Sequence, residues 1–358
     1  MAYVAVKGGE KAIEQSLKLL EMFHSCDRKI SVSEIMENMP LLIDKVMSEA
    51  GLYAPEYAAL ALKQSKGSME ESVFLLRAYR STLKRDYYSL AVDCRDMRII
   101  RRISAAFKDV PGGQILGPTF DYAHRLLNFD LLDNSECPDT QTDIDDDCEC
   151  EDIYCPRVDD ILQEDGVLEK PDEDNTKPYD VTSRLLTFPA PRSARLQTLT
   201  RSEEGFLEGV AYSAMRGYGA VHPTVSELRS GYVQIEIPHP LHKGETICIG
   251  EIIVTEVEAL WPSHTETDEE FDKLTLSGGY GCVIGRNETK AIAMAIADAS
   301  LNTTGPTPSQ DEEFVLTHGD CLEMQGFLSH LKLPHYVTFQ SKLDRVRSNK
   351  SGEEKDNG

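Results

Sequence analysis

Two histidines near the end of the chain have the residue type and spacing that suit metal binding. His330 and His335 flank the segment Leu-Lys-Leu-Pro, and neutral imidazole is the commonest metal ligand in proteins. Ligands that share a metal on one helix usually lie four residues apart, whereas these lie five apart. Pro334 cannot continue a helix, so we expect one histidine at a helix end and the other after a turn. The pair supplies fewer than the three ligands of a catalytic zinc, and the alternative is a packed histidine beside an exposed one.

Arginines and glycines in the first third of the chain could bind an anion. A predicted helix over residues 97–107 leads directly into the loop Pro111-Gly-Gly-Gln-Ile-Leu-Gly-Pro118. Glycine loops expose backbone N–H groups that can surround a phosphate, and arginine binds phosphate through paired donors. The chain has no G-x-x-x-x-G-K-[ST] loop, so a nucleotide would need such a substitute. The alternative is a solvated basic surface and an ordinary turn. The predicted substrate-binding residues are Arg98, Arg101, Arg102, Gly112, Gly113, Gln114 and Arg125.

Three further residues are candidates for acid–base chemistry. Asp121 and His124 lie within about one turn of each other on a helix that Thr119 or Asp121 would cap. Glu312 lies among three adjacent acidic residues, a pattern that is as typical of a solvated loop as of a carboxylate site. We take Asp121, His124 and Glu312 as the candidate catalytic residues.

Composition limits the classes of function. The chain has 358 residues and 41% hydrophobic residues, enough for two domains or one large domain with insertions. Its net charge of −24 argues against nucleic-acid binding, which relies on basic side chains. No apolar run is long enough to span a membrane, and the first residues lack the apolar core of a signal peptide. We therefore expect a cytoplasmic protein whose nine cysteines are reduced.

The order of the predicted elements indicates an α+β fold with three regions. Residues 1–132 are mainly helical, and residues 183–358 mix strands and helices. Between them, residues 133–182 form an acidic, partly disordered insertion; from Asp139 to Asp180 there are 17 acidic residues against three basic ones. Its four cysteines lack paired C-x2-C spacing, so free thiols are favoured over a structural zinc.

The C-terminal region contains the strand signals. Alternating apolar residues predict a strand over residues 232–237, and β-branched residues predict another over residues 245–260. The glycines of residues 278–285 predict a flexible turn followed by a short strand. Asn287 is expected to cap an alanine-rich helix over residues 288–299.

Several of these segments resemble the PhnI subunit family of the bacterial carbon–phosphorus lyase complex. The resemblance includes Asp109-Val-Pro-Gly-Gly-Gln-Ile-Leu-Gly-Pro118 and Phe327-Leu-Ser-His-Leu-Lys-Leu-Pro-His335. It extends over nearly the whole chain, with further matching blocks at residues 3–13, 75–80, 101–105, 119–127, 216–219, 310–316 and 336–337. The acidic stretch from about residue 137 to residue 180 departs from the family pattern.

The resemblance implies a role in extracting phosphate from alkylphosphonates. Members of the family displace adenine from ATP with methylphosphonate, which gives ribose 1-methylphosphonate 5-triphosphate, and act alone as purine nucleosidases. The implied partners are the radical-SAM lyase subunit and the other core subunits, besides ATP and alkylphosphonate. The implied metal, zinc or a similar divalent ion, binds at a subunit interface through the residues that match His330 and His335. Two other readings stay open, namely a non-catalytic scaffold subunit and a two-histidine metallohydrolase.

Overall fold

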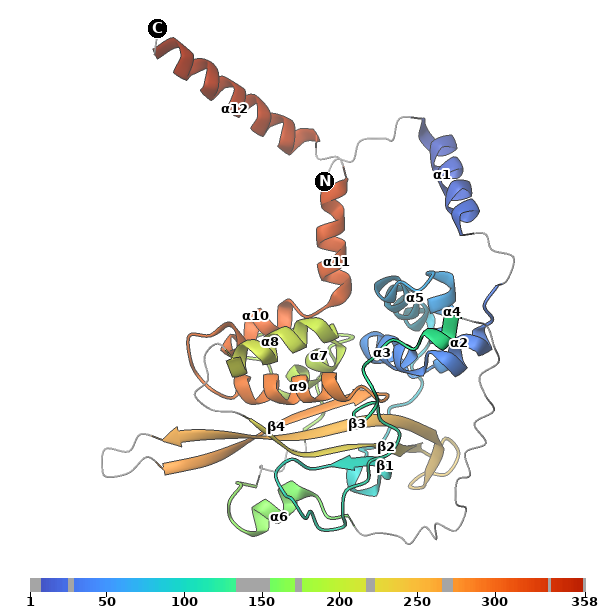
Figure 1. The fold of residues 1–358 in the computed structure, drawn as a ribbon, viewed down its shortest axis with the longest axis vertical. Coiled ribbons are helices and arrows are strands. Elements are labelled where there is room, and N and C mark those ends of the chain that lie inside the picture. Colours follow the sequence, from blue (N-terminus) through green and yellow to red (C-terminus); the bar gives the residue numbers. More distant parts are fainter. Residues whose placement is uncertain are drawn as a thin grey trace.

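The structure, a computed structural model, describes residues 8–24, 29–132, 155–170, 176–216, 223–265, 273–333 and 336–356. It confirms the α+β class, because a four-stranded antiparallel sheet is combined with helices on both sides of it (Figure 1). The strands are β1 (Arg98–Ile103), β2 (Thr224–Pro238), β3 (Thr246–Thr265) and β4 (Lys273–Ile284). The α-helices are α1 (Gly9–Phe23), α2 (Val32–Asn38), α3 (Pro40–Ala50), α4 (Pro55–Gln64), α5 (Met69–Thr82), α6 (Val158–Glu164), α7 (Arg192–Arg201), α8 (Glu204–Arg216), α9 (Glu288–Leu301), α10 (Glu312–Thr317), α11 (Cys321–Ser329) and α12 (Tyr336–Asp356).

The sheet has the strand order β1-β2-β3-β4, in which β2 and β3 form a long hairpin. The strands predicted at residues 232–237 and 245–260 are confirmed, and both are longer than expected. The helix predicted over residues 97–107 is wrong, because residues 98–103 form β1 and pair antiparallel with β2. Three of the six residues of β1 are isoleucines, whose β-branched side chains favour a strand.

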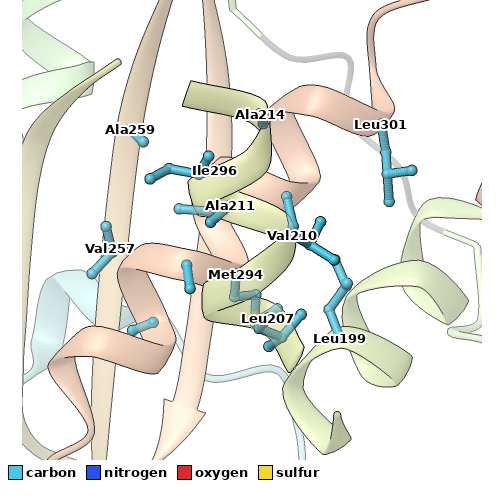
Figure 2. Close-up of a cluster of buried hydrophobic side chains, with 14 of the residues drawn as sticks. Leu199, Leu207, Val210, Ala211, Ala214, Val257, Ala259, Met294, Ile296 and Leu301 are labelled. Atoms are coloured by element: carbon cyan, nitrogen blue, oxygen red, sulfur yellow. The ribbon is translucent and has the colours of Figure 1, made fainter. Parts of the chain in front are cut away.

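Helices α7, α8, α9 and α10 enclose the main apolar core on one face of the sheet. Figure 2 shows Leu207 and Val210 of α8 and Met294 and Ile296 of α9 in one cluster, with Val257 of β3 on the strand to their left. Each such side chain contributes on the order of 1.5–3 kcal/mol when it is fully buried. This core fixes the position of α9 on the sheet.

Glycines in β4 bring α9 unusually close to the sheet. For residues 278–285 the predicted short strand is confirmed, but the predicted turn before it is wrong, because the residues from 278 to Ile284 all lie in β4. A Cβ atom at Gly279 would lie 2.2 Å from the Ala295 carbonyl oxygen, and one at Gly281 would lie 2.1 Å from that of Ala291. We call this contact between the two glycines and the alanines of α9 the β4–α9 seam. Glycine is required here by close packing of two backbones.

Helices α2 to α5 form a separate bundle with its own apolar core, around Val46, Met47 and Val73. A capping box at Ser31 begins α2. The Ser31 amide donates to Glu34 Oε2 at 2.6 Å, and the Glu34 amide donates to Ser31 Oγ at 3.0 Å. Ile284, at the end of β4, packs against this bundle, so the bundle lies beside the start of α9.

The other face of the sheet is covered in part by the acidic region. Val158 and Leu162 of α6 pack with Val110 and Leu260, so residues 158–168 are ordered against the sheet (Figure 1). This segment is the ordered part of the acidic region predicted over residues 133–182. Three of its four cysteines, Cys137, Cys148 and Cys150, lie outside the described residues, as do residues 217–222.

Helices α1 and α12 stand away from the sheet and its helices in Figure 1. None of the side chains of α1 is buried. Short 3₁₀ turns complete the chain at η1 (Cys94–Asp96), η2 (Phe129–Leu132), η3 (Pro308–Gln310) and η4 (His330–Lys332). Within the described ranges, no helix is both long and apolar enough to cross a membrane.

Candidate functional site

A cavity of about 580 Å³ lies where the first turn of α9 meets β1 and the N-terminal end of α3. We call it the α9 cavity. Charged side chains from five segments far apart in the chain line it: Lys45, Arg101, Asp121, Glu204, Arg286 and Glu288. Of the residues predicted for substrate binding or catalysis, Arg101 and Asp121 line this cavity.

Arg101 is the cation that joins β1 to the loop and to α9. Its guanidinium pairs with Asp121, and its Nε lies 2.7 Å from Glu288 Oε1. The Arg101 side chain is buried, whereas that of Asp121 is half exposed. Burial raises the pKa of Glu288, and the charge of Arg101 acts in the opposite direction. The arginine therefore holds two carboxylates at one wall of the cavity.

Asp121 lies in an irregular segment, so the helix predicted to begin at Thr119 or Asp121 is wrong. The Asp121 amide donates to Thr119 Oγ1 at 3.1 Å, a local turn that competes with helix formation. His124 and Arg125 follow in the same segment, where both are exposed and neither lines the cavity.

Glu204 organises the opposite wall. Its carboxylate accepts a hydrogen bond from Asn287 Nδ2 at 2.7 Å and lies 2.9 Å from Lys45 Nζ. Its amide donates to Glu49 Oε1 at 3.3 Å, which ties the start of α8 to α3. Lys290 lies beneath this wall, fully buried, with its Nζ 3.3 Å from Ser48 Oγ.

The start of α9 is held by both its cap and its preceding turn. Asn287 Oδ1 accepts from the Lys290 amide at 3.3 Å, which confirms the predicted cap. Arg286 binds Asp44 through its amide at 3.1 Å and its Nε at 2.7 Å. Gly285 has a φ of 82°, and a Cβ atom there would lie 2.5 Å from Asp44 Cβ. The N-terminal end of α9, which is the positive end of its dipole, is therefore fixed beside Lys45, Arg101 and Arg286.

Arg102 supports the glycine loop instead of facing the cavity. Its Nη1 donates to the carbonyl oxygens of Pro111 at 2.7 Å and Gly113 at 2.9 Å, and its Nη2 donates to that of Pro156 at 2.7 Å. Its Nε pairs with Glu227. These donors are occupied by the protein, so the prediction that Arg102 and the loop form a phosphate cradle is not supported by its contacts.

The remaining predicted anion ligands are dispersed. Gly112 and Gly113 both have positive φ, as the turn requires, and Gln114 Nε2 donates to the Ser104 carbonyl oxygen at 3.4 Å. Arg98 lies at the exposed end of β1, where its Nη2 is 2.7 Å from Glu251 Oε2 and its guanidinium stacks on Tyr232. None of these residues lines the α9 cavity.

Glu312 is not brought near Asp121. It lies in the first turn of α10, where its Oε2 accepts from the Ala190 amide at 3.1 Å and its Oε1 lies 3.8 Å from Arg195. Asp311 caps that helix through the Phe314 amide at 3.0 Å. These contacts account for two of the three adjacent acids as helix-terminal residues.

His330 lies at the end of α11, as its spacing before Pro334 predicts, and begins η4. Its Nδ1 contacts the Phe327 carbonyl oxygen. Because a carbonyl only accepts, Nδ1 carries the proton, and Nε2 is the nitrogen that suits a metal. His335 lies outside the described residues, and within them no three His, Cys, Asp or Glu side chains gather around one point. His330 alone fits a ligand whose partners come from elsewhere.

Sequence reasoning missed Lys45, Glu204, Arg286 and Glu288. The cap at Asn287 was a usable signal, because a helix N-terminus that follows a glycine-rich strand commonly binds anions. The pairing of Lys45 with Glu204 has no local signal, because the two residues belong to different helices.

Comparison with known proteins identifies the family. Residues 2–353 match the family described as bacterial phosphonate metabolism protein (PhnI). The chain is 44% identical over 355 residues to the alpha-D-ribose 1-methylphosphonate 5-triphosphate synthase subunit PhnI of Escherichia coli K12, covering 96% of this chain and 97% of that one. It is 45% identical over 365 residues to a putative C-P lyase subunit protein, HtxH, of Stutzerimonas stutzeri, covering 97% and 96%. A PhnI synthase subunit of Rhizobium meliloti is 42% identical over 360 residues, covering 96% and 94%. The chain belongs to the PhnI family of bacterial phosphonate metabolism proteins.

Proposed function

We propose that this chain is the subunit of a carbon–phosphorus lyase complex that transfers the ribosyl triphosphate of ATP to methylphosphonate, with the reaction in the α9 cavity. The names of two relatives, synthase subunits for ribose 1-methylphosphonate 5-triphosphate, support this product. The observation that carries the proposal is the gathering of Lys45, Arg101 and Arg286 with a capped helix N-terminus around one cavity. Its volume of about 580 Å³ lies in the range of small-molecule sites.

The reaction breaks the bond between ribose C1′ and adenine N9, whose electron pair leaves with the adenine. A methylphosphonate oxygen forms the new bond to C1′, and the proton lost by the phosphonate is taken up by the adenine. Positive charge develops at C1′, as in glycoside cleavage, so a nearby carboxylate stabilises the transition state. Cations and helix N–H groups stabilise the phosphate and phosphonate oxygens.

Arg101 and Lys45 are placed to bind the anionic oxygens of the substrates. Arg101 pairs with Asp121. When an anionic oxygen replaces Asp121 at the guanidinium, the carboxylate is released toward the ribose. Lys45 can make the same exchange from Glu204, since its side chain is 38% exposed. In both ion pairs an anionic substrate oxygen would take the place of a carboxylate of the protein.

The metal implied by the resemblance belongs to a different part of the chain. His330 would supply one nitrogen ligand at the end of α11, together with His335 and a group from a partner subunit. Bound there, a divalent ion would join the subunit to its lyase partner. A cytoplasmic location and the radical-SAM partner belong to the same proposal. His124 and Glu312 receive no step, because they do not line the α9 cavity.

The test measures adenine. The purified chain, alone and with the other core subunits, is incubated with ATP and methylphosphonate, and adenine is measured by chromatography while phosphorus NMR follows the product. We expect Asp121→Asn to lower adenine release by about 10²-fold or more, since it removes one charge-stabilising group.

Asp86→Asn is the matched control. Asp86 is as exposed as Asp121, at 54% against 52%, and is likewise paired with one cation, Lys84, at 2.6 Å. We expect it to release adenine at the rate of the unchanged chain. Equal activity of the two variants would remove Asp121 from the site, formation of ADP would indicate a phosphohydrolase, and no adenine in the full complex would favour a scaffold.

A further inference from the structure

A second, smaller cavity lies beside the end of α7. Its volume is about 220 Å³, and it is bounded by residues 181–186, the last turn of α7 and the beginning of α11. Arg184 and Arg201 line it, together with Asp320 and Glu323. We call it the α7–α11 cavity. It adjoins the α9 cavity, because Ser202 lines the one and Glu204 lines the other.

Arg201 has a buried Nε that no hydrogen-bond acceptor reaches among the described residues. The charges of Asp320 and Asp180 act on its guanidinium from nearby. Buried guanidinium groups normally have their donors occupied, since an unpaired one loses its hydration without compensation. Arg102, for comparison, makes contacts with three carbonyl oxygens and one carboxylate.

Two further arginines crowd Arg201. Gly51, which has a φ of 65°, lies against the guanidinium groups of Arg80 and Arg201. A Cβ atom there would be 2.8 Å from Arg80 Nη1 and 3.9 Å from Arg201 Nε. Burial lowers the pKa of Arg201 to about 10, and the charges of Arg77 and Arg80 add to that effect, while those of Asp320 and Asp180 oppose it. Three cations therefore meet at the C-terminal end of α3.

Most of the nearby negative groups are already engaged. Arg77 donates to the Glu49 carbonyl oxygen at 2.7 Å, and Arg80 donates to that of Ala50 at 2.9 Å. Asp320 lies 2.5 Å from Arg77 Nη1 and caps α11 by accepting from the amides of residues 322 and 323. Glu323 is the second acid of the lining. The lining itself holds two arginines and two acids, and Asp320 is shared with Arg77, which lies outside the lining.

We propose that the α7–α11 cavity binds a small tetrahedral dianion, inorganic phosphate or a short alkylphosphonate, between Arg201 and Arg184. Such an anion supplies oxygen acceptors in the paired geometry that guanidinium groups prefer. A volume of about 220 Å³ suits one tetrahedral group and is too small for a whole nucleotide, since typical drug-sized sites begin at about 300 Å³. The site is distinct from the α9 cavity and does not depend on its chemistry.

Calorimetric titration of the full chain with inorganic phosphate, and separately with methylphosphonate, tests this site at constant ionic strength. We expect Arg201→Gln and Arg184→Gln each to weaken binding roughly tenfold or more, as expected for loss of a charged hydrogen bond. Arg345→Gln, which removes the same charge from an exposed position on α12, should bind the anion as the unchanged chain does. The anion that binds more tightly shows whether the cavity prefers inorganic phosphate or an alkylphosphonate.

Thermal unfolding separates binding from a purely structural role of Arg201. Without phosphate, Arg201→Gln should unfold at the same or a higher temperature than the unchanged chain, because it removes a buried donor without an acceptor from a crowded site. With phosphate, the unchanged chain should gain stability and the variant should not. A large loss of stability without phosphate, or an equal gain in both proteins, would overturn the proposal. Arg184→Gln gives the same test at a more exposed position.

Discussion

Arg102 of β1 and Glu227 of β2 form an ion pair that is shielded from water, although 125 residues separate them in the chain. The two side chains are 0% and 2% exposed. The same guanidinium holds the carbonyl oxygens of Pro111, Gly113 and Pro156. One residue thus joins the edge strand, the glycine loop and the segment that leads into α6.

Loss of Arg102 should destabilise the fold strongly. We expect Arg102→Met to lower the free energy of unfolding by about 3–5 kcal/mol. Three carbonyl oxygens would lose their donor, and the buried Glu227 would lose one of its two arginines and keep only Arg229, at 3.0 Å. Urea denaturation measures this. Arg98→Met is the control on the same strand, since the Arg98–Glu251 pair is exposed and should contribute less than about 1 kcal/mol. Equal losses in the two variants would contradict a structural role for Arg102.

The β4–α9 seam should not accept a side chain. Gly281→Ala places a methyl group against the Ala291 carbonyl oxygen, so we expect a loss of about 1–3 kcal/mol in unfolding free energy from overpacking. Adenine release should fall as well, because the first turn of α9 moves away from Arg101. Gly278→Ala is the matched control in the same strand, since nothing lies within 4 Å of the place its methyl group would occupy. Similar behaviour of the two variants would show that α9 can shift without consequence.

The buried amine of Lys290 should make stability rise in mildly alkaline solution. Burial lowers its pKa from 10.5 to about 8, although Glu49 and Glu204 oppose the shift. Between pH 8 and 10.5 the unfolded chain therefore binds more protons than the folded one, and stability increases with pH. Below pH 8 the charged amine costs about 3 kcal/mol relative to its unfolded state.

Lys290→Met isolates this effect. The unfolding free energies of the unchanged chain and of Lys290→Met are measured between pH 8 and 10.5. As the pH rises, the unchanged chain should gain stability relative to the variant. Lys63→Met, at an exposed position on α4, should leave the pH profile as it is. A constant difference between the unchanged chain and Lys290→Met would mean that the amine keeps its ordinary pKa.

Lys45 should affect substrate binding more than folding. Its amine is 38% exposed at the α9 cavity, so Lys45→Gln should change the melting temperature little. We expect KM for ATP to rise roughly tenfold, as expected for the loss of a charged contact to phosphate. Initial rates of adenine release over a range of ATP concentrations measure this, and Lys63→Gln serves as the control. An unchanged KM would place the triphosphate elsewhere.

Local signals allowed much of the fold to be predicted. The capping oxygens of Ser31 and Asn287 mark helix starts because each satisfies an amide only three residues away. Strand β1 was misread because its partner β2 lies more than 100 residues later, and without that partner the arginines resemble a helix surface. The glycines of β4 were misread for a similar reason, since their purpose is evident only once α9 lies against them.

The candidate site was predictable only in part. Arg101 and Asp121 were found through their residue types and closeness in sequence, and both line the α9 cavity. Lys45, Glu204 and Arg286 come from three other segments, and only the packing of α3, α8 and α9 brings them together. Arg102 illustrates the opposite case. Its closeness in sequence to the glycine loop predicts a phosphate ligand, but its guanidinium binds the carbonyl oxygens of the loop itself.

The β4–α9 seam also determines how this protein can change by mutation. Glycine is the smallest residue, so any replacement at Gly279 or Gly281 adds atoms to a contact that has no room for them. Variation at these positions can move α9 outward but can never draw it closer. The separation of α9 from the sheet is therefore already at its lower limit, and substitutions at these two positions can act on it in one direction only.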